Sequence, residues 1–237
     1  MPALSIIVPC YNEAENILLI LEKFSRVLKG LSAELILVNN GSTDESGEIL
    51  RGELKNPLYC FARVVSIAKN IGYGHGIMTG LREAKGDVLA WTHADLQTDP
   101  ADVIRAYQKF RELEKKDANI LIKGRRLNRR LGERFFTFGM ACLASFVLGE
   151  ALYDINAQPK MFSKSFLLKM KNPPDDFSLD LYLMYLAKHF NYKTYTIPVH
   201  FGERIYGESK SAANFKSRCR TIMRTFKYTF ALRSRMR

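Results

Sequence analysis

Four short apolar runs alternate with stretches of helical spacing in the first half of the chain, and this alternation constrains the fold more than any other feature. The runs span residues 4–8, 35–38, 62–67 and 87–91. Between them apolar residues recur every three to four positions, as at Ile17, Ile20, Leu21 and Phe24. This pattern is typical of buried parallel strands joined by helices and predicts a doubly wound α/β sheet. We therefore interpret residues 1–122 as a nucleotide-binding half, with its ligands at the carboxyl ends of the strands.

The second half of the chain departs from this alternation. We expect a basic loop at 123–134, an uncharged apolar segment at 135–149, a helix over 178–190, a strand over 192–199 and a helix over 212–231. No internal repeat or low-complexity linker divides the 237 residues. The prediction is one domain over 1–211 followed by a basic tail over 212–237. Within the domain, 1–122 forms the nucleotide half and 123–211 the acceptor half.

The positive charge is concentrated in two segments. The chain has 36 Lys+Arg and 24 Asp+Glu, which gives a net charge of +12. Residues 123–134 contribute +5 and residues 204–237 contribute +9, so the rest of the chain carries −2. Two basic segments on a mildly acidic body indicate sites for anions rather than general solubility. From charge alone the candidate partners are phosphorylated ligands, an anionic membrane surface and nucleic acid.

The chain has no basic region before its first apolar run, so we expect no secretory signal. No apolar run reaches the roughly 18 residues that a spanning helix needs. The four cysteines, Cys10, Cys60, Cys142 and Cys219, are far apart and are interpreted as core residues in a reducing compartment. These features predict a cytoplasmic protein.

Polar residues follow each of the four predicted strands. They are Pro9, Tyr11 and Glu13 after the first run, Asn39 and Asn40 after the second, Lys69 and Asn70 after the third, and His93, Asp95 and Gln97 after the fourth. Because the carboxyl ends of parallel strands meet at one edge of a sheet, we expect these residues to form one site.

These loops carry a specific resemblance. The segments are SIIVPCYNEAENI at 5–17, ELILVNNGSTDES at 34–46, AKNIGYGHGIMTGL at 68–81, THADLQTDP at 92–100 and RIYGESK at 204–210. In this order they resemble the inverting glycosyltransferases of family 2, over about residues 4–210. The resemblance implies the GT-A nucleotide-sugar fold, with a mostly parallel central sheet flanked by helices. It is strongest to transferases with a polyprenyl-phosphate acceptor, which often carry transmembrane helices that we do not expect here.

The loop after the fourth strand is the candidate metal site. Loss of a nucleoside diphosphate leaves negative charge on the departing phosphate, which a divalent cation stabilises. Such cations take oxygen ligands, commonly one or two carboxylates together with the substrate phosphates. By the resemblance Asp95 and Gln97 hold Mg²⁺ or Mn²⁺. The family usually has Asp-any-Asp in this motif, and His93 replaces the first Asp, so we expect altered donor contacts rather than lost catalysis.

The first three loops are the candidate nucleotide site. By the resemblance Pro9, Tyr11 and Glu13 stack on and contact the base. Asn39 and Asn40 stand where relatives commonly have two aspartates that accept from the base, and an asparagine both accepts and donates. The choice between uracil and guanine stays open. Lys69 and Asn70, just before Gly72, can approach the nucleotide; a plain turn is the alternative for these glycines.

The acceptor half supplies the other candidate catalytic residues. Asp154 occupies the place of an acid near the acceptor in relatives. It would be the general base for a sugar hydroxyl, whereas an ionised phosphate needs no strong base and Asp154 would then organise cations. By resemblance Arg126 faces a phosphate, assisted by Arg130 or Arg134, and Arg204 and Lys210 belong to a loop that closes on the diphosphate.

The sequence does not decide whether Asp180 is an acid near the acceptor or a surface carboxylate.

The tail presents a clearer pattern, because six apolar residues form one stripe of a helix, with four basic residues beside it. The stripe is Phe215, Cys219, Ile222, Met223, Phe226 and Phe230, and the basic residues are Lys216, Arg220, Arg224 and Lys227. A basic amphipathic helix suits an anionic membrane surface, and packing on the body is the alternative.

Together these features predict a transferase that moves a sugar from a UDP- or GDP-sugar to a polyprenyl phosphate or lipid-linked glycan. We place it in the cytoplasm, peripheral at the inner face of the membrane. Two alternative functions are transfer to a soluble glycan hydroxyl with Asp154 as base, and a catalytically silent membrane scaffold. An RNA-binding module is disfavoured because no RNA-binding signature accompanies the basic clusters, so we expect no nucleic acid partner.

Overall fold

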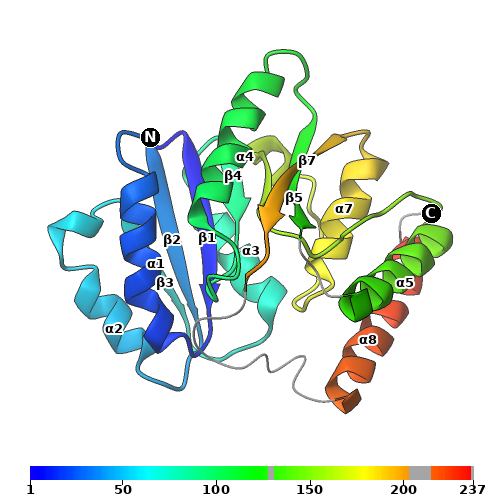
Figure 1. Ribbon diagram of the computed structural model, residues 1–237, viewed down its shortest axis with the longest axis horizontal. Coiled ribbons are helices and arrows are strands. Elements are labelled where there is room, and N and C mark those ends of the chain that lie inside the picture. The colour runs from blue at the N-terminus through cyan, green and yellow to red at the C-terminus, as the bar shows by residue number, and fades with distance from the viewer. Residues whose placement is uncertain (128–130, 203–214, 236–237) are drawn as a thin grey trace.

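A seven-stranded sheet forms the centre of the protein in the computed structural model, with strand order β3-β2-β1-β4-β6-β5-β7 (Figure 1). The structure describes residues 1–127, 131–202 and 215–235, without the side chains of 131–138, 140, 215–222 and 235. The strands are β1 (Leu4–Cys10), β2 (Ala33–Asn40), β3 (Ala62–Ile67), β4 (Val88–Trp91), β5 (Ile120–Leu127), β6 (Lys160–Ser163) and β7 (Lys193–His200). β6 is antiparallel to β4 and β5, whereas the other described pairs are parallel. The prediction of a mostly parallel α/β sheet is confirmed.

Helices cover both faces of this sheet. They are α1 (Ala14–Val27), α2 (Ser46–Glu53), α3 (Tyr73–Glu83), α4 (Pro100–Leu113), α5 (Leu131–Leu148), α6 (Lys164–Leu167), α7 (Leu179–His189) and α8 (Phe215–Arg235), with a 3₁₀ turn η1 (Pro57–Tyr59). The start of α4 illustrates how the sequence sets these bounds. Asp99 accepts a hydrogen bond from the Ala101 amide at 2.9 Å, and Pro100 follows as the first helical residue.

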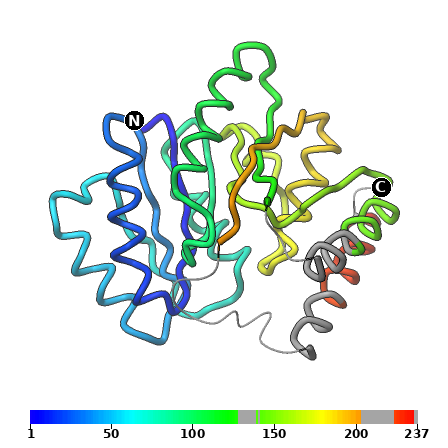
Figure 2. Tube along the Cα trace, viewed as in Figure 1, coloured from blue at the N-terminus to red at the C-terminus, as the bar shows by residue number. Residues whose placement is uncertain are grey.

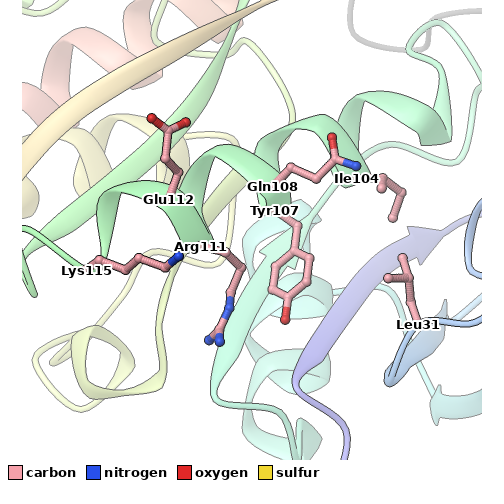
Figure 3. Close-up of a pocket in the computed structure, with 7 residues that line it drawn as sticks. All are labelled: Leu31, Ile104, Tyr107, Gln108, Arg111, Glu112 and Lys115. Atoms are coloured by element: carbon pink, nitrogen blue, oxygen red, sulfur yellow. The ribbon is translucent and has the colours of Figure 1, made fainter.

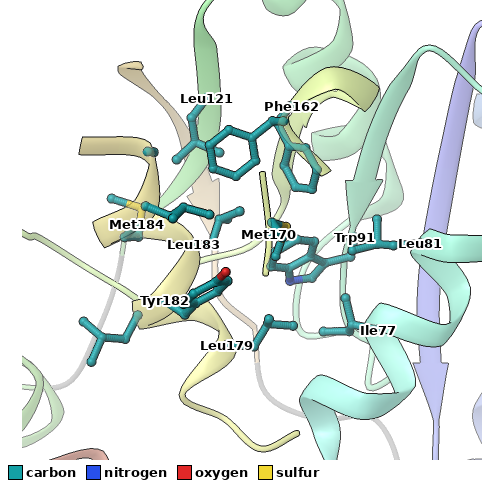
Figure 4. Close-up of a cluster of buried hydrophobic side chains, with 14 of the residues drawn as sticks. Ile77, Leu81, Trp91, Leu121, Phe162, Met170, Leu179, Tyr182, Leu183 and Met184 are labelled. Carbon is teal, nitrogen blue, oxygen red and sulfur yellow. The ribbon is translucent and has the colours of Figure 1, made fainter. Parts of the chain in front are cut away.

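Successive residues of the central strands point into two different cores. On one face Ile6 and Val8 of β1 pack with residues of α1 and α4. On the other face Ile7 packs with residues of α3 and α7. Figure 4 shows this second core converging on Trp91 and Phe162. Each large apolar side chain buried in this way contributes about 1.5–3 kcal/mol, which exceeds the ~0–1 kcal/mol of an exposed ion pair. Apolar burial on both faces therefore fixes the sheet that positions the loops.

The second half departs from the sequence prediction at two places. Residues 123–127 belong to β5 and α5 begins at Leu131, so the prediction of a basic loop over 123–134 is wrong for the described residues. The expected boundary after residue 122 falls inside this strand. The short strand β6 was not predicted at all. By contrast, the predicted helix at 178–190 and strand at 192–199 correspond to α7 and β7.

Helices α5 and α8 pack against each other at the opposite end of the molecule from α2 (Figures 1 and 2). Within the ranges that the structure describes, no helix is both long and apolar enough to cross a bilayer. Cys10 is buried as expected, but Cys60 and Cys142 are exposed, so the interpretation of every cysteine as a core residue is wrong.

Candidate active site

The loops after β1 and β2 are interlocked by hydrogen bonds between side chains and backbone. The Asn12 amide N–H donates to Ser42 Oγ at 3.1 Å, and the Thr43 amide N–H donates to Asn12 Oδ1 at 2.8 Å. The Glu13 amide N–H donates to Ser46 Oγ at 2.9 Å. Asn12 has φ +56°, in the left-handed region that asparagine tolerates. The first two loops therefore form one preorganised surface at the carboxyl edge of the sheet.

The two asparagines at the end of β2 have different environments. Asn39 is partly exposed, and its Oδ1 accepts from the Ser42 amide at 3.1 Å, so part of its acceptor capacity supports the turn. Asn40 is buried, and its Nδ2 donates to the Gly72 carbonyl at 3.0 Å. Asn40 therefore holds the third loop in place, whereas Asn39 is partly exposed, as is Tyr11.

The glycines after β3 are required by a close approach of the backbone. A Cβ on Gly74 would lie 2.2 Å from the Pro174 carbonyl oxygen. The His75 amide N–H donates to the Asp175 carbonyl of the same segment at 3.0 Å. His75 Nδ1 also lies 3.1 Å from Asp175 Oδ1. In the described structure these glycines accommodate the 174–176 backbone.

The loop after β4 holds the candidate metal ligands. Asp95 is buried, and its Oδ1 accepts from the Gln97 amide N–H at 3.2 Å. The Gln97 side chain donates from Nε2 to the Gly202 carbonyl at 3.1 Å, which engages the nitrogen end of its amide. Leu96, between them, has φ +54°. The turn thus brings one carboxylate and one amide to the same end of β4.

This donor set fits a divalent cation that arrives with a diphosphate. Among the described residues, no group of three or more His, Cys, Asp or Glu side chains could hold a metal ion. A hard cation that takes most of its ligands from phosphates and water needs only one or two protein carboxylates. The Asp95 carboxylate meets that requirement, together with the side-chain amide of Gln97 two residues away.

Tyr73 is a site residue that the sequence reasoning missed. Its ring stacks on Phe177 with centroids 4.7 Å apart and lies 5.9 Å from the His93 ring. Its hydroxyl accepts from Gln158 Nε2 at 3.2 Å. Burial raises the pKa of Tyr73 well above its ordinary value, and the Asp180 carboxylate adds to the shift. Tyr73 lies inside the AKNIGYGHG segment, where its position between two glycines was the available signal.

Arg126 and Asp154 form the centre of the acceptor half. Asp154 Oδ1 accepts from Arg126 Nε at 3.0 Å and from Nη2 at 2.5 Å, and Oδ2 accepts from the Arg126 amide at 2.9 Å. Both side chains are largely buried. Gly124 permits this arrangement, because a Cβ there would lie 2.0 Å from the Gln158 carbonyl oxygen. The fold therefore brings Arg126 and Asp154, two candidate catalytic residues, into direct contact.

The electrostatics of this pair favour an ionised Asp154. Desolvation acts to raise the pKa of Asp154, but the Arg126 guanidinium and its hydrogen bonds outweigh it and lower that pKa below its ordinary value. A carboxylate with a lowered pKa accepts protons poorly. The Arg126 guanidinium also lies over the Phe201 ring, 5.4 Å from its centroid. The arrangement orients a cation more readily than it removes a proton.

A second ion pair lies deeper in the same half. Lys160 Nζ is 3.1 Å from Asp180 Oδ1, and both side chains are buried. Asp180 Oδ1 also accepts from Gln158 Nε2 at 2.9 Å. The alternative of Asp180 as a surface carboxylate is therefore wrong. Arg204 and Lys210, the other predicted catalytic residues, lie outside the described residues, as does Arg130 and the side chain of Arg134.

A shallow hollow elsewhere on the surface does not belong to this site. Its lining, shown in Figure 3, consists of Leu31 and residues of α4 and its end, including Ile104, Tyr107 and Lys115. Leu31 precedes β2, so the hollow lies at the amino ends of the strands. The candidate site occupies the other edge.

Comparison with known proteins identifies the family. The glycosyl transferase family 2 domain matches residues 5–167. The chain belongs to glycosyl transferase family 2. The resemblance drawn from the sequence motifs is thereby confirmed. The matched region ends before the 174–176 segment, Phe177, Asp180 and the Phe201–Gly202 contacts, and it includes the other described site residues named above.

Curated relatives match most of this chain. This family 2 chain is 28% identical over 213 residues to the undecaprenyl-phosphate 4-deoxy-4-formamido-L-arabinose transferase of Edwardsiella ictaluri, covering 87% of this chain and 62% of the relative. It is 27% identical to the protein of that name from Yersinia enterocolitica, with the same coverage. The chain thus spans less than two thirds of the length of these relatives.

Among solved structures, this family 2 chain is similar to glucosyl-3-phosphoglycerate synthase from Mycobacterium tuberculosis. In complex with Mn²⁺, UDP and phosphoglyceric acid, that enzyme matches with a TM-score of 0.71 and 19% identity, over 98% of this chain and 78% of the other. A complex with glucosyl-3-phosphoglycerate matches with a TM-score of 0.68. This likeness confirms the predicted GT-A fold.

Proposed function

We propose that the protein transfers a sugar from a UDP- or GDP-sugar to a polyprenyl phosphate, with inversion at the anomeric carbon. Membership of glycosyl transferase family 2 supports sugar transfer. The observation that carries the choice of acceptor is the buried Arg126–Asp154 pair, in which the carboxylate is held ionised by three hydrogen bonds. The name of the curated relatives, undecaprenyl-phosphate transferases, supports the same acceptor class.

The donor is proposed to lie on the joined loops after β1 and β2. Tyr11 and Asn39 are at the surface there, beside Pro9 and Glu13, and they would contact the base. Lys69 is exposed in the third loop and would approach the diphosphate. His93 and Tyr73, whose rings are 5.9 Å apart, would face the ribose or the sugar. Asn40 would not contact the donor but would hold the third loop in place through its bond to the Gly72 carbonyl.

Asp95 and Gln97 would hold a divalent metal together with the donor diphosphate. Bound Mg²⁺ or Mn²⁺ would neutralise the charge that grows on the departing phosphate. The chain's own part is to present the Asp95 carboxylate in a fixed turn, which the Gln97 amide N–H stabilises. The contact from Gln97 to the Gly202 carbonyl ties this turn to the chain that follows β7.

Arg126 would bind the acceptor phosphate. Within the described residues, Asp154 engages Nε and Nη2 of the guanidinium, and Nη1 would donate to the anion. Arginine suits phosphate because its planar fork matches the oxygens. A phosphate monoester is already ionised near neutral pH, so its oxygen can attack the anomeric carbon without a general base. Arg204 and Lys210 are proposed to close on the diphosphate.

A hydroxyl acceptor is the weaker alternative. It requires Asp154 to take up a proton during the reaction. The Arg126 guanidinium lowers the pKa of Asp154, which opposes that role. The lowered pKa of Asp154 does not hinder a phosphate acceptor, because no proton has to be removed from an ionised phosphate.

The proposed place of action is the inner, cytoplasmic face of the membrane. On α8 the exposed side chains include Met223, at 55% exposure, and Phe230, at 48%, with Arg224 and Lys227 beside them. The side of α8 that is buried contains Thr229 and Leu232 instead. Of the predicted apolar stripe, Met223 and Phe230 are exposed and Phe226 is partly exposed, which supports contact with an anionic bilayer.

A donor panel tests the proposed function. The full chain is incubated with UDP-, GDP- and dTDP-sugars, with and without Mg²⁺ or Mn²⁺, and thermal unfolding is recorded. Each stabilising donor is then tested for transfer to a polyprenyl phosphate in detergent. We expect one nucleotide class to raise Tm in a metal-dependent way and to support transfer. Nucleotide-sugar binding without transfer to any acceptor would instead favour the silent scaffold.

A further inference from the structure

Three consecutive carbonyl groups of the acceptor half are held by two buried lysines. Lys123 Nζ donates to the Tyr153 carbonyl and, at 2.6 Å, to the Asp154 carbonyl. Lys160 Nζ donates to the Ile155 carbonyl. Backbone carbonyls in a loop usually bond to water or to other backbone groups. Here side chains from two neighbouring strands, β5 and β6, replace those partners.

Both lysines are almost completely shielded from solvent. Lys160 is 0% exposed and Lys123 is 2% exposed. Lysine is rarely buried to this extent unless it is paired, because removing an ammonium from water is costly. Asp180 lies beside Lys160 at 3.1 Å, but no carboxylate within the described residues forms a salt bridge to Lys123. Such an arrangement is a poor way to build a stable core, and it suggests a task at the site.

The segment that these lysines hold is the one that orients Arg126. Asp154 has φ +43°, in the left-handed region that aspartate and asparagine adopt more readily than most other residues. From this turn its carboxylate makes three hydrogen bonds to Arg126. The position of the guanidinium therefore depends on the turn, and the turn depends on the ammonium groups beneath it.

The same network reaches the donor side. Gln158 Nε2 donates to Asp180 Oδ1 at 2.9 Å and to the Tyr73 hydroxyl at 3.2 Å. Tyr73 in turn lies beside His93. One buried set of hydrogen bonds thus runs from the aromatic residues at the donor loops, through Gln158 and Asp180, to Lys160 and the 153–155 turn.

We propose that Lys123 and Lys160 are positioning residues that hold the 153–155 backbone so that Asp154 fixes the Arg126 guanidinium for the acceptor phosphate. The inference rests on the proposed function, since it concerns how that phosphate is bound. The lysines do not touch the substrates and act through the turn. Their removal is therefore expected to affect the acceptor more than the donor.

The test uses Lys123→Met, which keeps the length of the side chain and removes its donors. Steady-state kinetics of the full chain with a polyprenyl phosphate are expected to show an acceptor KM raised by about 10- to 100-fold, because a small displacement of a positioning contact has effects of this size. The donor KM is expected to change less than threefold. Lys164→Met is the matched control, because Lys164 Nζ also donates to a carbonyl, that of Ala84, away from the site.

A double-mutant cycle separates positioning from general structural support. If Lys123 acts through Arg126, the combination of Lys123→Met with Arg126→Ala raises the acceptor KM no further than Arg126→Ala alone. Additive losses, or equal losses in donor and acceptor KM, would overturn the proposal. Thermal unfolding accompanies each variant. Lys160→Met replaces Lys123→Met in the cycle if the latter does not fold, and failure of both to fold would show that the lysines are structural only.

The two proposals fail in different ways. If the wild type transfers sugar to polyprenyl phosphate and Lys123→Met has an unchanged acceptor KM, the proposed function stands and the positioning role is overturned. Absence of wild-type transfer to any polyprenyl phosphate refutes the function, and the positioning role for that phosphate falls with it.

Discussion

The donor edge and the acceptor half of the molecule are held together by different forces. At the donor edge, neutral polar side chains in adjacent loops bond to backbone, as Asn12 does with the Thr43 amide. In the acceptor half, buried ion pairs hold the segments together, as in the Arg126–Asp154 and Lys160–Asp180 pairs. Neutral contacts cost little to bury, whereas buried charges are costly unless they are paired. The comparison suggests that the donor edge is a rigid platform and that the acceptor half is tuned by charge.

The largest effect is expected at the donor edge from Asp95→Asn. Loss of the carboxylate removes the charge that holds the metal, and we expect transfer to fall by at least about 100-fold, as when one stabilising group for a developing anion is removed. The measurement is kcat with saturating donor and acceptor at several metal concentrations.

Asp99→Asn is its matched control. Asp99 lies in the same loop, is exposed and caps α4, and asparagine caps a helix about as well as aspartate. Near wild-type turnover of Asp95→Asn would remove Asp95 from the metal site and with it the division of roles between the two halves.

A smaller, acceptor-specific effect is expected from Arg126→Lys. A lysine cannot reproduce the guanidinium fork, and loss of a charged hydrogen bond of about 1.5–3 kcal/mol corresponds to a rise in acceptor KM of roughly 10- to 100-fold. The donor KM should stay near wild type, and both are read from initial rates.

Arg125→Lys provides the comparison, since Arg125 is the exposed neighbour on β5. Equal effects at positions 125 and 126 would mean that charge in this region, rather than the oriented guanidinium, attracts the acceptor.

A further loss, of about tenfold, is expected in membrane binding when Met223 and Phe230 are both changed to serine. These exposed side chains would each lose part of the ~1.5–3 kcal/mol that burying them in lipid contributes. Co-sedimentation with anionic liposomes measures the change. Leu58→Ser, at an exposed apolar position in η1, should bind as the wild type does. Equal binding of all three proteins would refute α8 as the contact.

The smallest effect concerns stability against pH. Burial and the neighbouring Lys160 ammonium lower the pKa of Lys123 from 10.5 to about 7. Between these values the unfolded chain binds more protons at this position, so the free energy of unfolding rises with pH across the window. Asp154, Arg126, Asp180 and Lys160 are the charged groups that act on Lys123.

We expect Lys123→Met to lose part of this rise in urea unfolding at pH 7 and pH 9. Lys160, whose pKa burial also lowers, retains a contribution of the same sign. Parallel curves for wild type and variant would show that Lys123 keeps its ordinary protonation in the folded protein.

The sequence predicted the donor edge well because its information is local. Each polar loop follows a buried apolar run, and Asp95 and Gln97 are only two residues apart. Motifs of this kind can be recognised without the fold. The role of Asn40 was less accessible, because its burial depends on Gly72, 32 residues away.

The acceptor half could not be predicted in the same way. Lys123 reaches Asp154 across 31 residues, and Lys160 meets Asp180 across 20, once β5, β6 and α7 are packed. A basic segment such as 123–134 resembles a solvated loop in sequence, since charge alone does not reveal burial. The one signal was that Lys123 ends an apolar run, ILIK, which places an ammonium inside a strand.

The most direct test of the central claim compares two acceptors that differ only in the phosphate. Wild-type protein is given the donor identified by the panel, with either polyprenyl phosphate or the corresponding polyprenol, and the product and its anomeric configuration are determined. We expect transfer to the phosphate with inversion, and no transfer to the alcohol. Comparable transfer to the alcohol, lost in Asp154→Asn, would show instead that Asp154 is a general base and would contradict the account.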